Sequence, residues 1–237
     1  AGSGKTTVLT KRVEFLVNYK SVQPENILAI TFTRKAKQEM LSRLKNLPVH
    51  IETFNSFCEK ILRRYNDLLY KKQIRVITYR NKIQIIRKAL TNMGTNIHSA
   101  INTYFTMAQK RGKTNKQLAN IFMNDCFFVR DYFKFKNKSI NKEDLQTTKH
   151  HKSAMLIFGV CNYIDSYMKK NGLRDFADQL VDAISLFKSN KDLIPKYNHI
   201  LIDEYQDINS TQIELIELLK PPNLFCVGDP RDRKSVV

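Results

Sequence analysis

The sequence predicts an α/β fold, in which a domain built on a parallel sheet is interrupted by a mostly helical insertion. Residues 1–70 and 171–237 alternate short apolar strands with amphipathic helices, whereas residues 71–170 show helical patterns and few strands. A glycine-rich loop opens the chain, and an acidic strand end lies near its other terminus. Because ligands bind at the carboxyl ends of parallel strands, these two distant segments can share one site. We therefore expect residues 1–70 and 171–237 to form one domain and residues 71–170 to form a second.

The chain begins with a phosphate-binding loop followed by a helix. Gly4, Lys5 and Thr6 fill the last three places of the pattern G-x-x-x-x-G-K-[ST]; its first glycine would precede Ala1, so we expect a cut pattern. Backbone N–H groups of such a loop bind phosphate, the lysine reaches the β- and γ-phosphates, and the hydroxyl ligates Mg²⁺. The alternative is a glycine-containing turn before an ordinary helix. The predicted nucleotide-binding residues are Ala1, Gly2, Ser3, Gly4, Lys5, Thr6 and Thr7.

The other elements of the α/β parts follow from apolar patterning. The first helix is predicted from apolar residues at helical spacing, namely Val8, Leu9, Val13, Leu16 and Val17. A short, nearly continuous apolar run predicts a buried parallel strand over residues 26–33. Further strands are predicted over residues 49–54, 199–204 and 223–229. Helices are predicted over residues 34–47, 55–65, 175–189 and 210–220. Ser210 is the expected cap of the last helix.

The positive charge of the chain is concentrated in the middle. The net charge is +18, and residues 71–170 hold 20 of the 40 lysines and arginines but only 5 of the 22 acidic residues. A basic block of this kind is a candidate surface for nucleic acid. The alternative is a solvated basic surface without a ligand.

The cysteines and the hydropathy pattern limit the class of protein. The four cysteines, Cys58, Cys126, Cys161 and Cys226, form no C-x-x-C pair, so neither a zinc site nor a disulfide framework is indicated. We expect reduced, buried thiols in a cytoplasmic protein. No apolar run approaches the length of about 20 residues that a membrane span needs, so no membrane partner is expected.

The segment "LIDEYQD" places acidic residues at the end of a predicted buried strand. Asp203 at this position can bind Mg²⁺ beside a phosphate loop, and Glu204 can orient and deprotonate an attacking water as general base. Gln206 is the third candidate catalytic residue, as a γ-phosphate sensor. The alternative is a charged loop after a strand.

Six blocks together resemble the UvrD/Rep group of superfamily 1 DNA helicases. They are "AGSGKT", "ILAITFTRKAKQEM", "TFNSF", "DFADQL", "LIDEYQDIN" and "LFCVGDP", in the family's order. The resemblance implies a RecA-like P-loop NTPase domain, called 1A, with a helical domain, 1B, inserted into it. It implies hydrolysis of ATP with Mg²⁺ coupled to 3′-to-5′ movement along single-stranded DNA, and a single-strand or junction substrate, as in DNA repair.

The same resemblance implies three sets of DNA contacts. Thr31, Phe32 and Thr33 form the first set, and Thr53, Phe54, Asn55 and Ser56 the second; Asp175 and Phe176 belong to a further block along the DNA path. For these residues the alternatives are structural, because an aromatic ring in an apolar strand is usually core, and Thr33 and Ser56 are ordinary helix caps.

The sequence departs from the family in two places. Asn55 stands where the family more often has His, and the residues after "VGDP" differ from the family's R-Q-S-I-Y. Asp232 replaces a glutamine expected to contact the γ-phosphate, and an anion there would repel phosphate. We expect the tail 231–237 to be non-native sequence, and the chain to be a truncated piece without the second motor domain. Its own ATP hydrolysis is therefore expected to be weak.

Other functions agree with part of these observations. The chain could belong to the helicase subunit of a helicase–nuclease complex. It could also be a nucleic-acid-binding module without catalysis, although intact Lys5, Thr6, Asp203 and Glu204 argue against this. A P-loop ATPase acting on protein or small molecules is disfavoured by the basic middle segment.

Overall fold

The computed structural model describes residues 4–45, 47–70, 73–136, 138, 142 and 150–229. The chain divides into two compact units. Unit 1 consists of Ala1–Leu69 and Gln179–Val237, and unit 2 of Tyr70–Asp178. Unit 1 is therefore discontinuous in sequence. The second change of unit falls at residues 178/179, where the sequence placed it at 170/171, because β4 (Leu173–Arg174) pairs with β3 (Arg75–Val76) of unit 2.

Unit 1 is built on a four-stranded parallel sheet of order β2-β1-β5-β6. The strands are β1 (Ile27–Thr31), β2 (His50–Thr53), β5 (His199–Ile202) and β6 (Asn223–Cys226). β1 is buried along its whole length because it lies between two strands and has both faces covered, which explains its unbroken apolar run. β6 is mostly exposed, and among the described residues no strand pairs with its outer edge.

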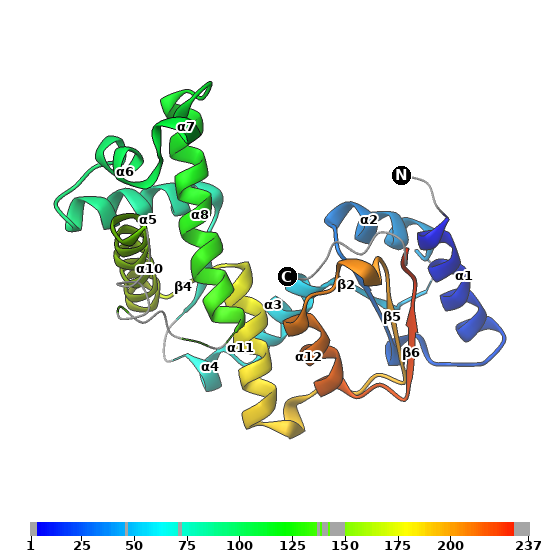
Figure 1. Cartoon of the computed structure of the whole chain (residues 1–237). Coiled ribbons are helices and arrows are strands. Elements are labelled where there is room, and N and C mark those ends of the chain that lie inside the picture. Colours follow the sequence, from blue (N-terminus) through cyan, green and yellow to red (C-terminus); the bar gives the residue numbers. More distant parts are fainter. Residues whose placement is uncertain are drawn as a thin grey trace. The chain divides into compact units, whose positions relative to one another are not determined.

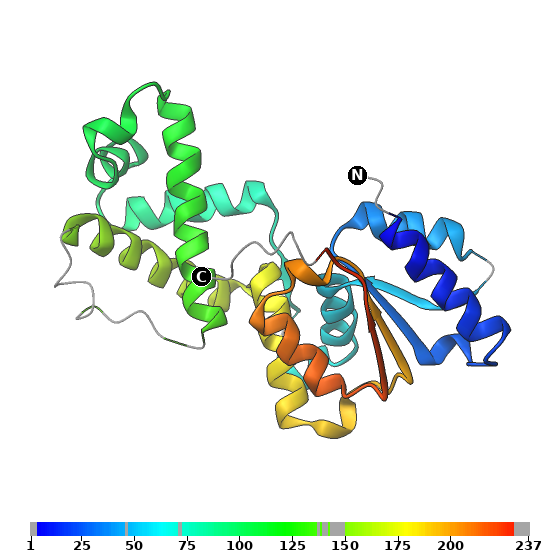
Figure 2. The same cartoon turned by 45° about the vertical axis from the view of Figure 1, so that its right-hand side comes forward.

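Helices cover both faces of this sheet (Figure 2). On one face, α1 (Lys5–Asn18) and α2 (Arg34–Arg43) pack against the sheet. On the other face lie α3 (Phe54–Arg64) and α12 (Ser210–Leu219). The core residues of the first face come from α1, α2, three strands and the positions next to α2 and β2: Leu9, Val13, Leu16, Ile27, Ala29, Met40, Leu44, Val49, Ile51 and Leu201.

Three local expectations need correction. Val8 is 53% exposed and faces away from the core, because it lies on the outer side of α1. The cap of α12 is Asn209, whose side chain accepts a hydrogen bond from the Gln212 backbone N–H, so the predicted cap Ser210 is already the first helical residue. Of the four free cysteines, Cys226 is exposed, since it lies on the edge strand β6.

Unit 2 is mostly helical (Figure 1). Its longer helices are α5 (Tyr79–Asn92), α6 (Ile97–Tyr104), α8 (Asn115–Phe135) and α10 (His151–Asn171), with the short α7 (Met107–Lys110) between α6 and α8. They enclose one apolar core, centred on the fully buried Phe122, Ile86 and Ile164. The short ladder of β3 and β4 is parallel.

Shorter elements complete the described chain. α4 (Asn66–Leu69) ends the first stretch of unit 1, and α11 (Phe176–Ser189) starts within the last residues of unit 2. Three 3₁₀ turns, η1 (Pro24–Asn26), η2 (Lys191–Leu193) and η3 (Tyr205–Asp207), each precede or follow a strand. Within the described part of the chain, no helix combines the length and the apolar character that crossing a bilayer requires.

Candidate active site

The glycine-rich loop and the acidic strand end meet in unit 1, although they lie about a full chain apart in sequence. Lys5 Nζ donates a hydrogen bond to Glu204 Oε2 at 2.5 Å. Thr6 Oγ1 donates to Asp203 Oδ2 at 2.9 Å. The predicted pairing of the two motifs at one site is therefore present in the structure.

The backbone explains how these side chains are placed. Gly4 caps α1 with a φ of 69°, a left-handed conformation that favours glycine. Asp203 directly follows β5, and its N–H donates to the carbonyl of Ile30 in the neighbouring strand. Lys5 and Thr6 thus begin α1 at the carboxyl end of β5. The predicted residues Ala1, Gly2 and Ser3 lie outside the described residues, as does Asp232.

Glu204 has an unusual backbone conformation. Its φ of 49° and ψ of 47° lie in the left-handed region, which costs a residue with a side chain about 1–3 kcal/mol. Gln206 Nε2 donates to Glu204 Oε2 at 2.6 Å, and Gln206 Oε1 accepts from the Asp229 backbone N–H at 2.9 Å. A Cβ on Gly228 would lie 2.7 Å from Gln206 Oε1, so only glycine leaves room for this arrangement. Glu204 and Gln206 are therefore held by each other, by Lys5 at the start of α1 and by the segment after β6.

The electrostatics of the pair keep both partners charged. The hydrogen bond to Glu204 raises the pKa of Lys5. Partial burial would raise the pKa of Glu204, but the hydrogen bonds from Lys5 and Gln206 outweigh it, and the pKa is lowered. Burial raises the pKa of Asp203, which is 2% exposed, against the opposing effect of the Thr6 hydroxyl. Glu204 is therefore ionised at neutral pH.

Thr6 and Asp203 can hold a divalent cation. They offer a hydroxyl and a carboxylate oxygen, and Mg²⁺ in phosphate-transfer sites commonly takes one or two protein oxygens while phosphates and waters supply the rest. Among the described residues no group of three His, Cys, Asp or Glu side chains forms a free-standing metal site. The donor set thus fits a cation bound together with a nucleotide.

Sequence reasoning missed one cation at this site. Arg43, at the end of α2, donates from Nη1 to Thr7 Oγ1 at 2.6 Å and from Nη2 to Glu39 at 2.6 Å. A guanidinium therefore lies beside the predicted nucleotide-binding residue Thr7. No sequence pattern that we recognised marks Arg43, because its distance from Thr7 is set by the packing of α1 against α2.

The two predicted DNA-contact turns lie next to each other. β1 and β2 pair with Thr31 opposite Thr53, so the turns that follow them emerge at the same edge of the sheet. Thr31 is fully buried, and Thr33 caps α2 by accepting from the Ala36 N–H. The half-buried Phe32 meets the Phe54 ring edge to face, with centroids 5.8 Å apart.

The second turn is a capping box at the start of α3. Thr53 Oγ1 accepts from the Ser56 N–H at 3.1 Å, and Ser56 Oγ accepts from the Thr53 N–H at 2.8 Å. Phe54 is 2% exposed and belongs to the core. Asn55 is half-buried, and its side chain makes no hydrogen bond to any described residue. The threonine and serine hydroxyls thus stabilise the start of α3, whereas no hydrogen bond to a described residue fixes the Asn55 side chain.

Glu52 joins these two turns, and sequence reasoning missed it. Glu52 is buried, and its carboxylate contacts Lys37, Lys60 and Ser56. The available signal was an acidic residue between Ile51 and Thr53 inside the predicted strand of residues 49–54.

The two residues of the third predicted set of DNA contacts differ in their exposure to solvent. Phe176 is 52% exposed. Asp175 is 1% exposed; its carboxylate accepts from Arg130 Nη1 at 3.0 Å and from the Asp178 N–H at 3.0 Å. The Asp178 carboxylate in turn accepts from the Asp175 N–H at 2.8 Å. We therefore interpret Asp175 as a residue that fixes the start of α11, because its carboxylate is buried in these contacts.

Arg130 is the centre of a buried ion-pair cluster. It is 3% exposed and contacts four carboxylates. Lys82 and Lys134 add two further cations, at Asp175 and Asp178. The carboxylates of the cluster belong to Asp131, Asp165, Asp175 and Asp178.

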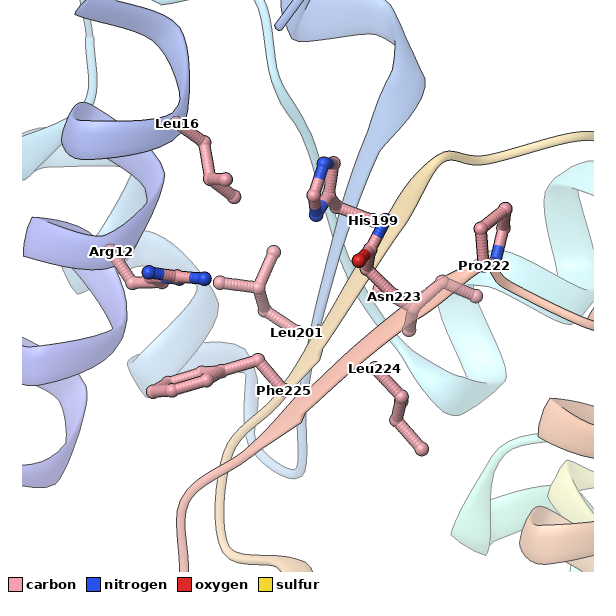
Figure 3. Close-up of a pocket in the computed structure, with 9 residues that line it drawn as sticks. Arg12, Leu16, His199, Leu201, Pro222, Asn223, Leu224 and Phe225 are labelled. Atoms are coloured by element: carbon pink, nitrogen blue, oxygen red, sulfur yellow. The ribbon is translucent and has the colours of Figure 1, made fainter. Parts of the chain in front are cut away.

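A cavity of about 260 Å³ lies in unit 1 away from the candidate active site. Figure 3 shows that Arg12 and Leu16 of α1 face His199 and Asn223 at the amino ends of β5 and β6. Asp203 and Glu204 follow the opposite, carboxyl end of β5. The cavity is therefore separate from the Lys5–Glu204 pair and supplies none of its groups.

The fold and the candidate active site together define the class of domain. A parallel sheet with helices on both faces, a Gly-Lys-Thr turn starting α1 and an acid after β5 are the features of a P-loop nucleotide-binding domain. The family model described as "UvrD/REP helicase N-terminal domain" matches residues 1–232. The chain belongs to this family, and the predicted RecA-like P-loop fold is confirmed.

Curated relatives agree with the family. A probable DNA helicase of Mycoplasma pneumoniae is 32% identical over 97% of this chain and 42% of its own length. The ATP-dependent DNA helicase PcrA of Staphylococcus epidermidis is 32% identical over 97% of the chain and 30% of its own length. A probable DNA helicase II homologue of Mycoplasma genitalium is 31% identical, with 97% of the chain and 32% of the relative covered. The chain thus spans about a third of the length of these relatives.

Proposed function

We propose that the chain is the first motor domain of an ATP-dependent DNA helicase, with unit 1 as domain 1A and unit 2 as the inserted domain 1B. The whole protein would hydrolyse ATP with Mg²⁺ and move along single-stranded DNA, in the 3′-to-5′ direction. The observation that carries the proposal is the convergence of Lys5 and Thr6 with Glu204 and Asp203. The naming of the relatives as DNA helicases supports the same function.

The residues divide the chemistry between them. Lys5 binds the β- and γ-phosphates, and Thr6 and Asp203 hold the cation. The Mg²⁺ ion, when bound, neutralises phosphate charge. Glu204 accepts the proton of the attacking water, which its ionised state allows.

Lys5 and Glu204 couple phosphate binding to base activation. Lys5 Nζ contacts Glu204 in the structure, so a phosphate that takes the ammonium group releases the carboxylate to orient water. Gln206 keeps Glu204 in place during this exchange, because it donates to Oε2 and is itself held by the Asp229 N–H.

Single-stranded DNA is proposed to cross the edge of the sheet at the turns after β1 and β2. The candidate contacts there are Phe32, Thr33, Thr53 and Asn55, and the neighbouring starts of α2 and α3 suit backbone phosphates. Phe176 adds an exposed ring for base stacking. The basic residues of unit 2 supply sequence-independent attraction to DNA.

The 237-residue chain is expected to bind ATP but to hydrolyse it slowly. In the relatives about two thirds of the length lies outside the matched region, and a second motor domain there would provide arginines that stabilise the transition state. The test is titration of the chain with a fluorescent ATP analogue and Mg²⁺, with Lys5→Ala as the matched control. We expect saturable binding that the substitution weakens at least tenfold. Equal binding by both proteins would refute the assignment of the site.

A further inference from the structure

Two lysines beside the proposed DNA-contact turns form ion pairs with the buried carboxylate of Glu52. Lys37 Nζ lies 2.5 Å from Glu52 Oε2, and Lys60 Nζ pairs with Glu52 Oε1. The Ser56 hydroxyl donates to Oε2 as well. Both oxygens of Glu52 are therefore occupied by donors from α2 and α3.

Glu52 is placed to act on both turns. It is the residue before Thr53, and it lies opposite Ile30 in the β1–β2 ladder. Lys37 sits in the first half of α2, the helix that starts after Thr33, and Lys60 lies on α3. One carboxylate thus holds the side chains of the two helices that follow the turns.

The hydrogen bonds around Glu52 favour its ionised form. Burial alone would raise its pKa, but hydrogen bonds from Lys37, Lys60 and Ser56 outweigh burial and lower it. Lys37 is 22% exposed in its side chain, and the Glu52 side chain 5%. The ion pair with Lys37 is therefore partly shielded from solvent and from salt.

We propose that Glu52 withholds Lys37 and Lys60 from nucleic-acid phosphates, so that these two lysines add no charged contacts to a single strand bound at the turns. This inference rests on the proposed function. Hydrogen bonds from a charged donor to phosphate are roughly twice as strong as neutral ones, and a motor must break its contacts at each step. Neutralising the lysines keeps the strand bound loosely enough to slide.

The test uses the salt dependence of oligonucleotide binding by the 237-residue chain. A single-stranded oligothymidylate is titrated by fluorescence anisotropy at several NaCl concentrations, for the wild type and for Glu52→Gln. Glutamine keeps the size of the side chain and can still accept from Ser56, but it carries no charge. Each lysine released to a phosphate should steepen the plot of log K against log[salt] by about 0.7. We therefore expect tighter binding at low salt and a steeper slope.

Glu14→Gln is the matched control. Glu14 pairs with Lys11 on the exposed side of α1, so this variant changes the net charge by the same amount and also frees a lysine. We expect a slope equal to that of the wild type. The double variant Glu52→Gln with Lys37→Met should return part of the way to the wild-type slope.

Single variants keep the proposal falsifiable if Glu52→Gln does not fold, which circular dichroism would reveal. Lys60→Met removes a side chain that is 72% exposed, and it should leave the slope unchanged. A flatter slope for Lys60→Met, or an unchanged slope for a folded Glu52→Gln, would overturn the proposal. If the wild-type chain binds no oligonucleotide, the proposed function fails together with this inference; if it binds and the variants contradict us, only the role of Glu52 fails.

Discussion

Replacing Asp131 by asparagine should stabilise the protein at neutral pH and stabilise it less in acid. Asp131 Oδ1 accepts from Arg130 Nη1 at 3.1 Å, and asparagine can accept the same hydrogen bond. The cluster around Arg130 sets four carboxylates against three cations, Arg130, Lys82 and Lys134. One negative charge is therefore in excess in the cluster, and the Asp131 side chain, which is 26% exposed, is more buried than that of Asp165.

The magnitude follows from the proton equilibrium of Asp131. Burial, together with the nearby charge of Asp175, raises its pKa from 3.8 to about 6. The folded state thus holds this proton more tightly than the unfolded state, and stability falls as pH rises between about 4 and 6. The full difference amounts to about 3 kcal/mol above pH 6. Asparagine cannot ionise, so the variant should recover up to this amount at pH 7.5.

The assay is equilibrium urea unfolding followed by far-ultraviolet circular dichroism at pH 7.5 and pH 4.5. We expect the free energy of unfolding of Asp131→Asn to exceed that of the wild type by at least about 1 kcal/mol at pH 7.5. At pH 4.5 the difference should shrink to about a third of its value at pH 7.5, because Asp131 is then protonated in the folded state but still mostly ionised in the unfolded state.

The control is Asp192→Asn. Asp192 is exposed, so the same chemical change should alter stability by less than about 0.5 kcal/mol at either pH. A lower stability of Asp131→Asn at pH 7.5, with no loss at pH 4.5, would show that the Asp131 charge stabilises the cluster. That result would refute the charge balance that we derive from the contacts.

Two further outcomes test the site and the core. Glu204→Gln keeps an acceptor for Lys5 but cannot take up a proton, so residual ATP turnover should fall by about 100-fold or more while ATP-analogue affinity is kept; a parallel loss of affinity and turnover would speak against the general-base role. Phe122→Ala, in the core of unit 2, should lower the free energy of unfolding by about 3–5 kcal/mol, whereas Phe128→Ala, 70% exposed on the same helix, should change it by less than about 0.5 kcal/mol. Similar effects of the two phenylalanine variants in urea unfolding would contradict the assignment of the core.

Several elements could be predicted because their signals are local. The apolar run of β1 and the helical spacing of Leu9, Val13 and Leu16 report burial through patterns only a few residues long. The catalytic candidates were found for a related reason, since a Gly-Lys-Thr turn and an acid at a strand end each have a chemical meaning on their own. Their meeting could then be inferred from the geometry of parallel sheets.

Other features depend on partners that the local sequence does not specify. Arg130 gathers acids from three helices and a strand end, and Glu52 pairs with Lys37 from another element. The cap of α12 is Asn209 and not the predicted Ser210. Two adjacent residues can both cap a helix, and the direction of the incoming chain selects one.

The sequence by itself determined the fold class, the family and the identity of the residues that meet at the candidate active site. The tertiary structure alone decided which charges are neutralised: Glu204 by Lys5, Glu52 by two lysines, and the aspartates around Arg130. The physical reason is the separation along the chain over which each kind of interaction acts. Hydrophobic periodicity and turn chemistry act between neighbours in the chain, whereas the pairing of buried charges depends on which surfaces the packed helices and strands bring within a few ångströms.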